Sequence, residues 1–156
     1  MDLVEYFLNK YKIQQKTYYN DSNNKYFINK YVNKIYLINL TSSRVRREYV
    51  KMIMKKLNIN FTIIVVKKIH VNVFRYLLSL TKEKMIKGEM GTYLSHMWCL
   101  KDAIKHNYEK FIILEDDVVF LKNFHEEFKK IVLKQNYDFL MLGAHHFKIS
   151  QYDYKI

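Results

Sequence analysis

The sequence predicts an α/β domain with a largely parallel central sheet. Apolar segments of strand length alternate with longer segments in which apolar residues recur every three or four positions, as in amphipathic helices. Polar and charged residues follow directly after several of the apolar segments. Ligands of parallel sheets bind at the carboxyl ends of the strands. We therefore expect the functional residues in those polar segments.

Four strands and four helices are predicted in the regular part of the chain. The expected strands are residues 35–40, 61–66, 111–114 and 138–143. The expected helices lie around residues 45–57, 74–80, 88–104 and 123–133. The first of these helices follows Thr41, Ser42 and Ser43, which are good capping residues. Within it, Val45, Tyr49, Met52, Ile53 and Leu57 recur at helical spacing, and the inward face of the third helix is expected to carry Met90, Leu94, Met97, Trp98 and Ile104.

Residues 1–33 are expected to form an N-terminal extension docked on a domain of residues 34–156. Within the extension, a short amphipathic helix is predicted from Leu3, Val4, Phe7, Leu8 and Tyr11. With 156 residues, 49% of them hydrophobic and 16% aromatic, the chain is not intrinsically disordered. No apolar stretch approaches the roughly 20 residues of a membrane span.

A cytoplasmic location is expected from the start of the chain and its cysteine content. Acidic residues stand where a secretory signal carries Lys or Arg. Cys99 is the only cysteine, which excludes an internal disulfide and suits a reducing compartment; we interpret it as a packing residue. The Lys-, Asn- and Ile-rich composition suits an AT-rich bacterium or a large DNA virus, and a viral protein would act in the host cytoplasm.

The net charge of +12 favours an anionic partner. A phosphate-bearing small molecule, a membrane surface and a nucleic acid all qualify. Nucleic acid is disfavoured, because the lysines are scattered and no arginine-rich or Gly-aromatic recognition motif is present. The alternative interpretation is that much of the Lys content is a solvated surface produced by an AT-rich coding sequence.

Three consecutive carboxylates, Glu115, Asp116 and Asp117, follow the third predicted strand. Strand geometry would place Glu115 and Asp117 on one side and Asp116 on the other. Two carboxylates on one side of a strand end suit Mg²⁺ or Mn²⁺, which take oxygen ligands. A solvated acidic turn is the alternative.

Two further groups are candidates for a binding site. Arg44, Arg46 and Arg47 open a predicted helix, where positive charge is unfavourable unless an anion binds there; the alternative is that they point into solvent. Glu89 and His96 share a helix face with Tyr93, although Glu89 is also favoured by the helix dipole and His96 could be a core histidine.

The order of these blocks resembles glycosyltransferase family 25, which includes lipooligosaccharide and procollagen galactosyltransferases. The matching blocks run from Ile35 to Arg47, Lys87 to His96, Ile113 to Asp117 and Tyr137 to Gly143. The resemblance implies a GT-A-like nucleotide-sugar-binding fold and a hexosyltransferase. It would transfer galactose or glucose from a UDP-sugar to a glycan, lipooligosaccharide or hydroxylysine-type protein acceptor.

The resemblance also implies roles for individual residues. Glu115 and Asp117 would be catalytic and would bind Mn²⁺ or Mg²⁺ against the diphosphate. The donor would be bound by Asn39, Arg44, Arg47, Glu89, Ser95, His96 and Asp116.

The chain is shorter after the acidic strand than the family's usual domain, so we expect a fold truncated at the C-terminus. Asp138, His145 and His146 are the nearby candidates for a general base, although Asp138 is expected simply to begin a strand and the two histidines to be ordinary loop residues. A second chain could complete the acceptor side. The alternative functions are an inactive relative that binds nucleotide sugar or a protein partner and, ranked last, a nucleic-acid-binding module.

Overall fold

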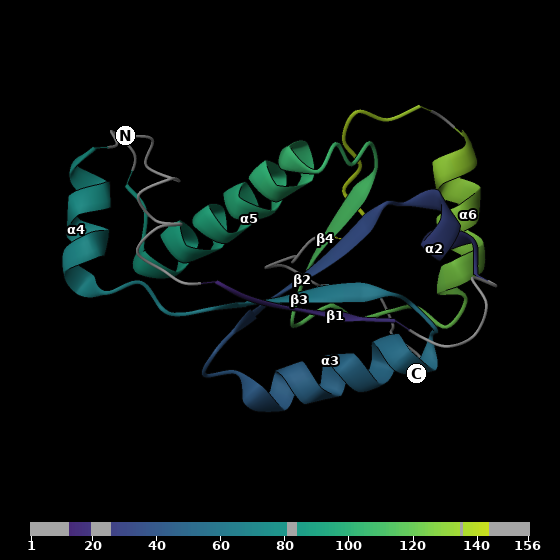
Figure 1. Cartoon of the computed structure of the whole chain (residues 1–156), viewed down its shortest axis with the longest axis horizontal. Helices are drawn as coiled ribbons and strands as arrows, with labels where there is room; N and C mark the ends of the chain where they lie inside the picture. Colours follow the sequence, from purple (N-terminus) through teal and green to yellow (C-terminus); the bar gives the residue numbers. More distant parts are fainter. Residues whose placement is uncertain (1–12, 20–25, 81–83, 135, 144–156) are drawn as a thin grey trace, which may run out of the picture.

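A computed structural model describes residues 13–19, 26–80, 84–134 and 136–143 of the protein (Figure 1). Its elements in chain order are β1 (Gln14–Tyr18), α2 (Phe27–Tyr31), β2 (Lys34–Leu40), α3 (Arg44–Lys56), β3 (Phe61–Val66), α4 (Val71–Ser79), α5 (Lys87–Lys105), β4 (Phe111–Glu115) and α6 (Phe124–Lys134). The α/β class is confirmed, and three predicted strands are present as β2, β3 and β4.

The four strands form one mixed, mostly parallel sheet in the order β1-β3-β2-β4. The central strand β2 runs parallel to both β3 and β4, whereas β1 runs antiparallel to β3. Ile38 lies opposite Ile64 on one side and opposite Glu115 on the other. The carboxyl ends of β2 and β4 therefore lie next to each other at one edge of the sheet.

Helices cover both faces of this sheet, with α3 along one face and α5 across the other (Figure 1). Alternate residues of the central strand serve the two faces: Leu37 packs on the α3 side and Ile38 on the α5 side. The core on the α3 side also contains Ile35, Val50, Met54, Ile59, Phe61, Ile63, Phe128 and Val132. The core on the α5 side contains Tyr36, Ile64, Val66, Cys99 and Ala103.

Strand β1 lies in the region predicted to be an irregular extension. Its residues are mostly exposed and polar, so hydrophobic pattern gave no signal for a strand. Pairing with β3 orders it: the Thr17 and Thr62 hydroxyls are hydrogen-bonded at 3.0 Å, and Tyr18 stacks on Phe61. The amphipathic helix predicted within residues 1–11 lies outside the described residues.

Helix α3 is present as predicted, but most of the apolar residues that indicated it are not the ones that pack on the sheet. Val50 and Met54 are buried against the sheet, whereas Val45 is 84% exposed and Tyr49 and Met52 are each 58% exposed. The helix carries apolar residues on two faces, and helical spacing alone cannot say which face meets the sheet. The predicted inward face of α5 is wrong at one residue, because Ile104 is exposed.

The predicted fourth strand, residues 138–143, does not form in this structure. Phe139 and Met141 are largely exposed, and the segment has no strand assignment in the described part of the chain. Strand propensity reflects packing against neighbouring strands, so a segment with high propensity does not form a strand unless another strand is hydrogen-bonded to it. Within the described ranges, no helix combines the length and apolar character needed to cross a bilayer.

Candidate functional site

The candidate site lies at the sheet edge where β2 and β4 end. The turn after β2 joins that strand directly to α3. Its backbone is fixed by two hydrogen bonds, from Thr41 N to Val66 O at 2.8 Å and from Ser43 N to Leu40 O at 2.9 Å. The acidic turn after β4 lies beside it, because Ile38 and Glu115 are register partners. The topology thus brings together two segments far apart in sequence.

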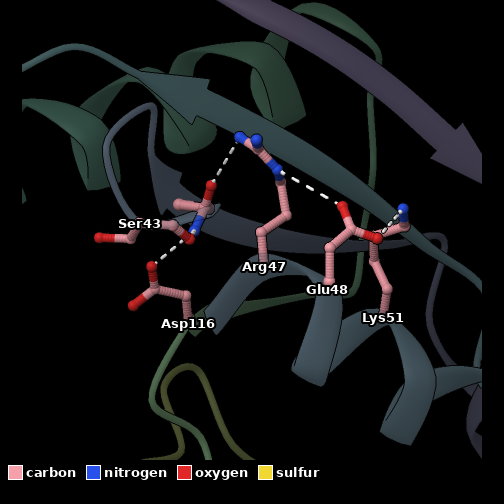
Figure 2. Close-up of polar contacts among 6 residues, drawn as sticks. Ser43, Arg47, Glu48, Lys51 and Asp116 are labelled. Atoms are coloured by element: carbon pink, nitrogen blue, oxygen red, sulfur yellow. Dashed lines mark hydrogen bonds and ion pairs between the residues drawn. The ribbon is translucent and has the colours of Figure 1, made fainter. Parts of the chain in front are cut away.

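A continuous set of polar contacts, here called the Asp116 network, joins the two turns. The Asn39 amide donates to Asp116 Oδ2 at 2.6 Å and to the Ser43 carbonyl at 3.1 Å. Arg46 Nη1 forms an ion pair with Asp116 Oδ1 at 3.0 Å, and Arg47 Nη1 donates to Asn39 Oδ1 at 3.1 Å. Figure 2 shows the Asp116 carboxylate pointing towards the turn that carries Ser43.

The network compensates a buried charge. Asp116 is 8% exposed and Asn39 is 1% exposed, so an unpartnered carboxylate here would lose most of its solvation. The Asn39 amide and the Arg46 guanidinium replace that solvation with two charge-assisted contacts. The side chain of Arg46 remains 51% exposed, which leaves much of its surface available to a ligand.

Glu115 and Asp116 point to opposite sides of the strand end, as strand geometry predicted. Asp116 contacts α3, whereas Glu115 Oε1 lies 3.2 Å from Nε2 of His96 on α5. The hydrogen bond with His96 holds the pKa of the Glu115 carboxyl below its usual value, and the charge of Arg46 adds to this. About half of the Glu115 side chain is exposed, so one rim of the site is open to solvent.

The predicted placement of Asp117 rested on strand geometry that does not reach it. Strand β4 ends at Glu115, and a hydrogen bond from Val118 N to Glu115 O, at 3.1 Å, closes a turn through Asp116 and Asp117. The alternation of side chains therefore stops before Asp117. Asp117 is exposed, and no other described side chain forms an ion pair or hydrogen bond with it.

The chemistry of Glu115 and Asp117 fits a divalent cation held mainly by substrate. No group of three or more His, Cys, Asp and Glu side chains that could hold a metal ion is present in the described ranges. However, Mg²⁺ bound to a diphosphate commonly uses one or two protein carboxylates, with phosphate oxygens and waters as its other ligands. Glu115 and Asp117 are exposed on one short segment and carry oxygens of this kind, of which Glu115 Oε1 also contacts His96, whereas both oxygens of Asp116 are engaged.

Other predicted donor-binding residues have local roles in the structure. The Glu89 carboxylate accepts a hydrogen bond from Ile86 N at 2.9 Å, so it caps the start of α5. The Ser95 hydroxyl is buried and donates to the Gly91 carbonyl at 2.7 Å. Arg44 is exposed and lies outside the Asp116 network. Of the predicted donor-binding set, Asn39, Arg47 and Asp116 come together in the network, and His96 adjoins it through Glu115.

Arg46 is the residue whose place in the site sequence reasoning missed. It was recognised as one of three arginines, but the resemblance selected Arg44 and Arg47. The sequence signal that could have indicated Arg46 was its spacing of three residues from Ser43, which places the two side chains on one helix face. In the structure, Arg46 Nη2 donates a hydrogen bond to Ser43 Oγ at 3.2 Å.

Of the three candidates for a general base, only Asp138 lies within the described residues. Asp138 is exposed and does not begin a strand, and His145 and His146 lie outside the described residues. Cys99 is fully buried, and burial raises the pKa of its thiol to about 12, which agrees with a packing residue rather than a nucleophile.

Comparison of the sequence with known proteins identifies the family to which the chain belongs. The sequence model of glycosyltransferase family 25, described as LPS biosynthesis proteins, matches residues 32–156. Neither the curated proteins nor the solved structures that were compared with the chain gave a match. The matched range contains both turns that form the site and every element from β2 to α6. The chain therefore belongs to glycosyltransferase family 25.

Proposed function

We propose that the protein transfers a hexose, galactose or glucose, from a UDP-sugar to a glycan, lipooligosaccharide or hydroxylysine-type protein acceptor. Family membership supports glycosyl transfer in general. The observation that carries the more specific proposal is the Asp116 network. It holds an arginine-bearing helix start against an acidic turn, which is the pairing that a metal-bound diphosphate requires.

The start of α3 supports binding of the donor diphosphate. Ser43 occupies the N-cap position, but its side chain makes no capping hydrogen bond, so it does not satisfy the first backbone N–H groups of the helix. A helix start of this kind favours an anion. Arg44 is exposed and Arg46 is half-exposed beside it, and guanidinium groups bind phosphate oxygens in bidentate fashion.

Charge development during transfer gives these residues a catalytic role. The bond between the anomeric carbon and the phosphate oxygen breaks, and its electron pair stays on the departing diphosphate. The acceptor hydroxyl oxygen forms the new bond to the anomeric carbon, and its proton passes to water or to an oxygen of the departing diphosphate. Arg44 and Arg46 stabilise the negative charge as it develops. Glu115 and Asp117 would hold Mn²⁺ or Mg²⁺, which supplies additional charge neutralisation when bound.

Asp116 has a positioning role in this proposal. Both of its carboxylate oxygens are engaged with Asn39 and Arg46, and its side chain is buried. It therefore fixes the orientation of Arg46 and does not contact the donor. Arg47 also has a positioning role, because it donates a hydrogen bond to Asn39, which in turn holds Asp116.

Nucleotide-sugar turnover tests the proposal directly. Release of UDP from UDP-galactose and UDP-glucose should be measured with Mn²⁺, with Mg²⁺ and with a chelator, in the presence of candidate sugar acceptors. Asp117→Ala and Arg46→Ala should each lower turnover by about tenfold or more, since each removes a group that stabilises the departing diphosphate. Arg75→Ala is the matched control, because Arg75 is an exposed arginine on α4.

Thermal stabilisation by the donor separates the alternatives. A rise in Tm with UDP-sugar and Mn²⁺, without turnover, would select an inactive relative that binds nucleotide sugar. If neither turnover nor stabilisation occurs, the proposed donor site is refuted. Salt-sensitive binding to a polynucleotide, with no response to UDP-sugar, would instead select a nucleic-acid-binding module.

A further inference from the structure

Helix α3 exposes an apolar stripe that the fold does not use. Val45, Tyr49 and Met52 are 84%, 58% and 58% exposed, and they follow one another at spacings of four and three residues. At 100° per residue these three side chains lie on one face of the helix, which we call the outer face of α3. The stripe spans about 10 Å along the helix axis.

The outer face points directly away from the core. Val50 and Met54 are buried against the sheet, and on the helical wheel they lie opposite Met52 and Val45. Solvent-facing helix positions are normally polar, so three apolar residues at the centre of this face are unusual. The helix packs on the sheet through its other apolar face.

Positive charge borders the stripe. Arg44 precedes it, Lys55 and Lys56 follow it, and all three are exposed. The one acidic residue of this helix, Glu48, is paired with Lys51 at 2.7 Å and lies 3.9 Å from Arg47 (Figure 2). Ion pairing holds the pKa of Glu48 below its usual value, and its charge is balanced locally. The outer face is therefore apolar at its centre and positive at its ends.

This combination identifies the kind of partner. A second copy of the chain would bring like charges together if two such faces met, and the net charge of +12 adds to that repulsion. A nucleic acid would require cationic or hydrogen-bonding groups at the centre of the face, where Val45 and Met52 lie instead. An anionic membrane surface matches both parts: acyl chains accept the apolar side chains, and lipid phosphates accept the basic ends.

We propose that the outer face of α3 docks the protein on an anionic membrane surface. The helix lies in the plane of the interface, with Val45, Tyr49 and Met52 inserted among the lipid headgroups and Lys55 and Lys56 against lipid phosphates. Tyrosine is favoured at this depth because its ring is apolar and its hydroxyl reaches water. The proposal concerns a different face of α3 from the donor site and does not depend on the proposed function.

Vesicle co-sedimentation tests the proposal with the full-length protein. Phosphatidylcholine vesicles containing about one third phosphatidylglycerol should bind it, and pure phosphatidylcholine vesicles should bind it far less. Tyr49→Ser/Met52→Ser should weaken binding by about tenfold or more, since two apolar side chains are lost. Lys55→Gln/Lys56→Gln should weaken it by roughly 25-fold, at about fivefold per lysine. Both variants should keep the wild-type Tm, because all four side chains are exposed.

Ile104→Ser supplies the matched control, since Ile104 is an exposed apolar residue on α5. It should bind anionic vesicles like the wild type. Equal loss of binding in this variant would show a general hydrophobic effect and overturn the assignment to α3. The proposal is also overturned if the wild type does not bind anionic vesicles, or if both α3 variants bind them as well as the wild type does. It is overturned as well if a single-stranded polynucleotide displaces the vesicles from the wild type and binds the Tyr49→Ser/Met52→Ser variant as tightly as the wild type.

Discussion

Replacing Asp116 by Ala should destabilise the fold as well as the site. The Asp116 carboxylate is buried and connects the turn after β4 to the start of α3 through Asn39 and Arg46. Its removal leaves the Asn39 amide with a single acceptor, the Ser43 carbonyl. The half-exposed Arg46 side chain loses its anionic partner at the same time. The substitution therefore breaks a contact between two segments that are 77 residues apart in the chain.

The expected loss follows from the two contacts. A hydrogen bond to a charged group contributes about 1.5–3 kcal/mol, and the 2.6 Å contact with Asn39 is of that kind. The ion pair with Arg46 adds about 0–1 kcal/mol, because the guanidinium is half-exposed and screened by solvent. Together these give about 1.5–4 kcal/mol. For a domain of this size, Tm should fall by roughly 3–16 °C. Asp116→Asn keeps an acceptor oxygen but loses the charge, so about half of the loss is expected.

Thermal unfolding and urea denaturation measure this loss, with Asp117→Ala as the matched control. Asp117 is the adjacent carboxylate, is exposed, and has no described side-chain partner. Its replacement should change stability by no more than about 0.5 kcal/mol while lowering sugar transfer. If the two alanine variants have the same stability, or if Asp117→Ala is the less stable, the distinction between a positioning carboxylate and a ligand-facing carboxylate is wrong.

Three further predictions concern the rest of the core and the rim. The pKa of Glu115 is lowered in the folded protein, so its contribution to stability is present above the ordinary pKa of about 4.5 and is lost as pH falls through the folded pKa. Urea unfolding of the wild type and of His96→Ala should be measured from neutral pH to about pH 3, and this contribution should be lost only in the wild type. Its size should be less than about 1 kcal/mol, because Glu115 is half-exposed. Cys99, whose buried thiol has a pKa raised to about 12, should react with a thiol reagent at neutral pH only after unfolding, and equal rates in native and denatured protein would contradict its burial. Met54→Ala removes a fully buried side chain between α3 and the sheet and should cost about 2–5 kcal/mol in chemical denaturation, whereas a loss below about 1 kcal/mol would show that the α3 packing is wrong.

Much of the fold was accessible from local sequence. The strands that became β2, β3 and β4 are continuous apolar runs, which is what a strand buried on both faces requires. The helices between them follow from apolar residues at helical spacing. The position of the site at the carboxyl ends of these strands was also predictable, because parallel connectivity places all such ends at one edge.

The sequence predicted less well which helix faces pack on the sheet and which strands pair with each other. Helix α3 has apolar residues on two sides, and the sequence offers no way to tell Val50 and Met54 from Val45 and Met52 as the packed pair. Strand β1 carries a polar sequence and is ordered by pairing with β3, which the chain reaches only after more than 40 residues. Residues 138–143 have the opposite character: they favour a strand locally but lack a hydrogen-bonded neighbour in the described part of the chain.

The sequence by itself determined the α/β class, the family, and the two polar segments in which the site lies. These properties depend on local composition and order, which a one-dimensional pattern records. Only the tertiary structure decided that Asp116 is buried between Asn39 and Arg46, that Glu115 faces His96, and that Asp117 stays open. The physical reason is that the solvation and pairing of a carboxylate depend on segments that are distant in the sequence and are brought near by strand register. The residues next to the carboxylate in the sequence do not show which distant residues will contact it.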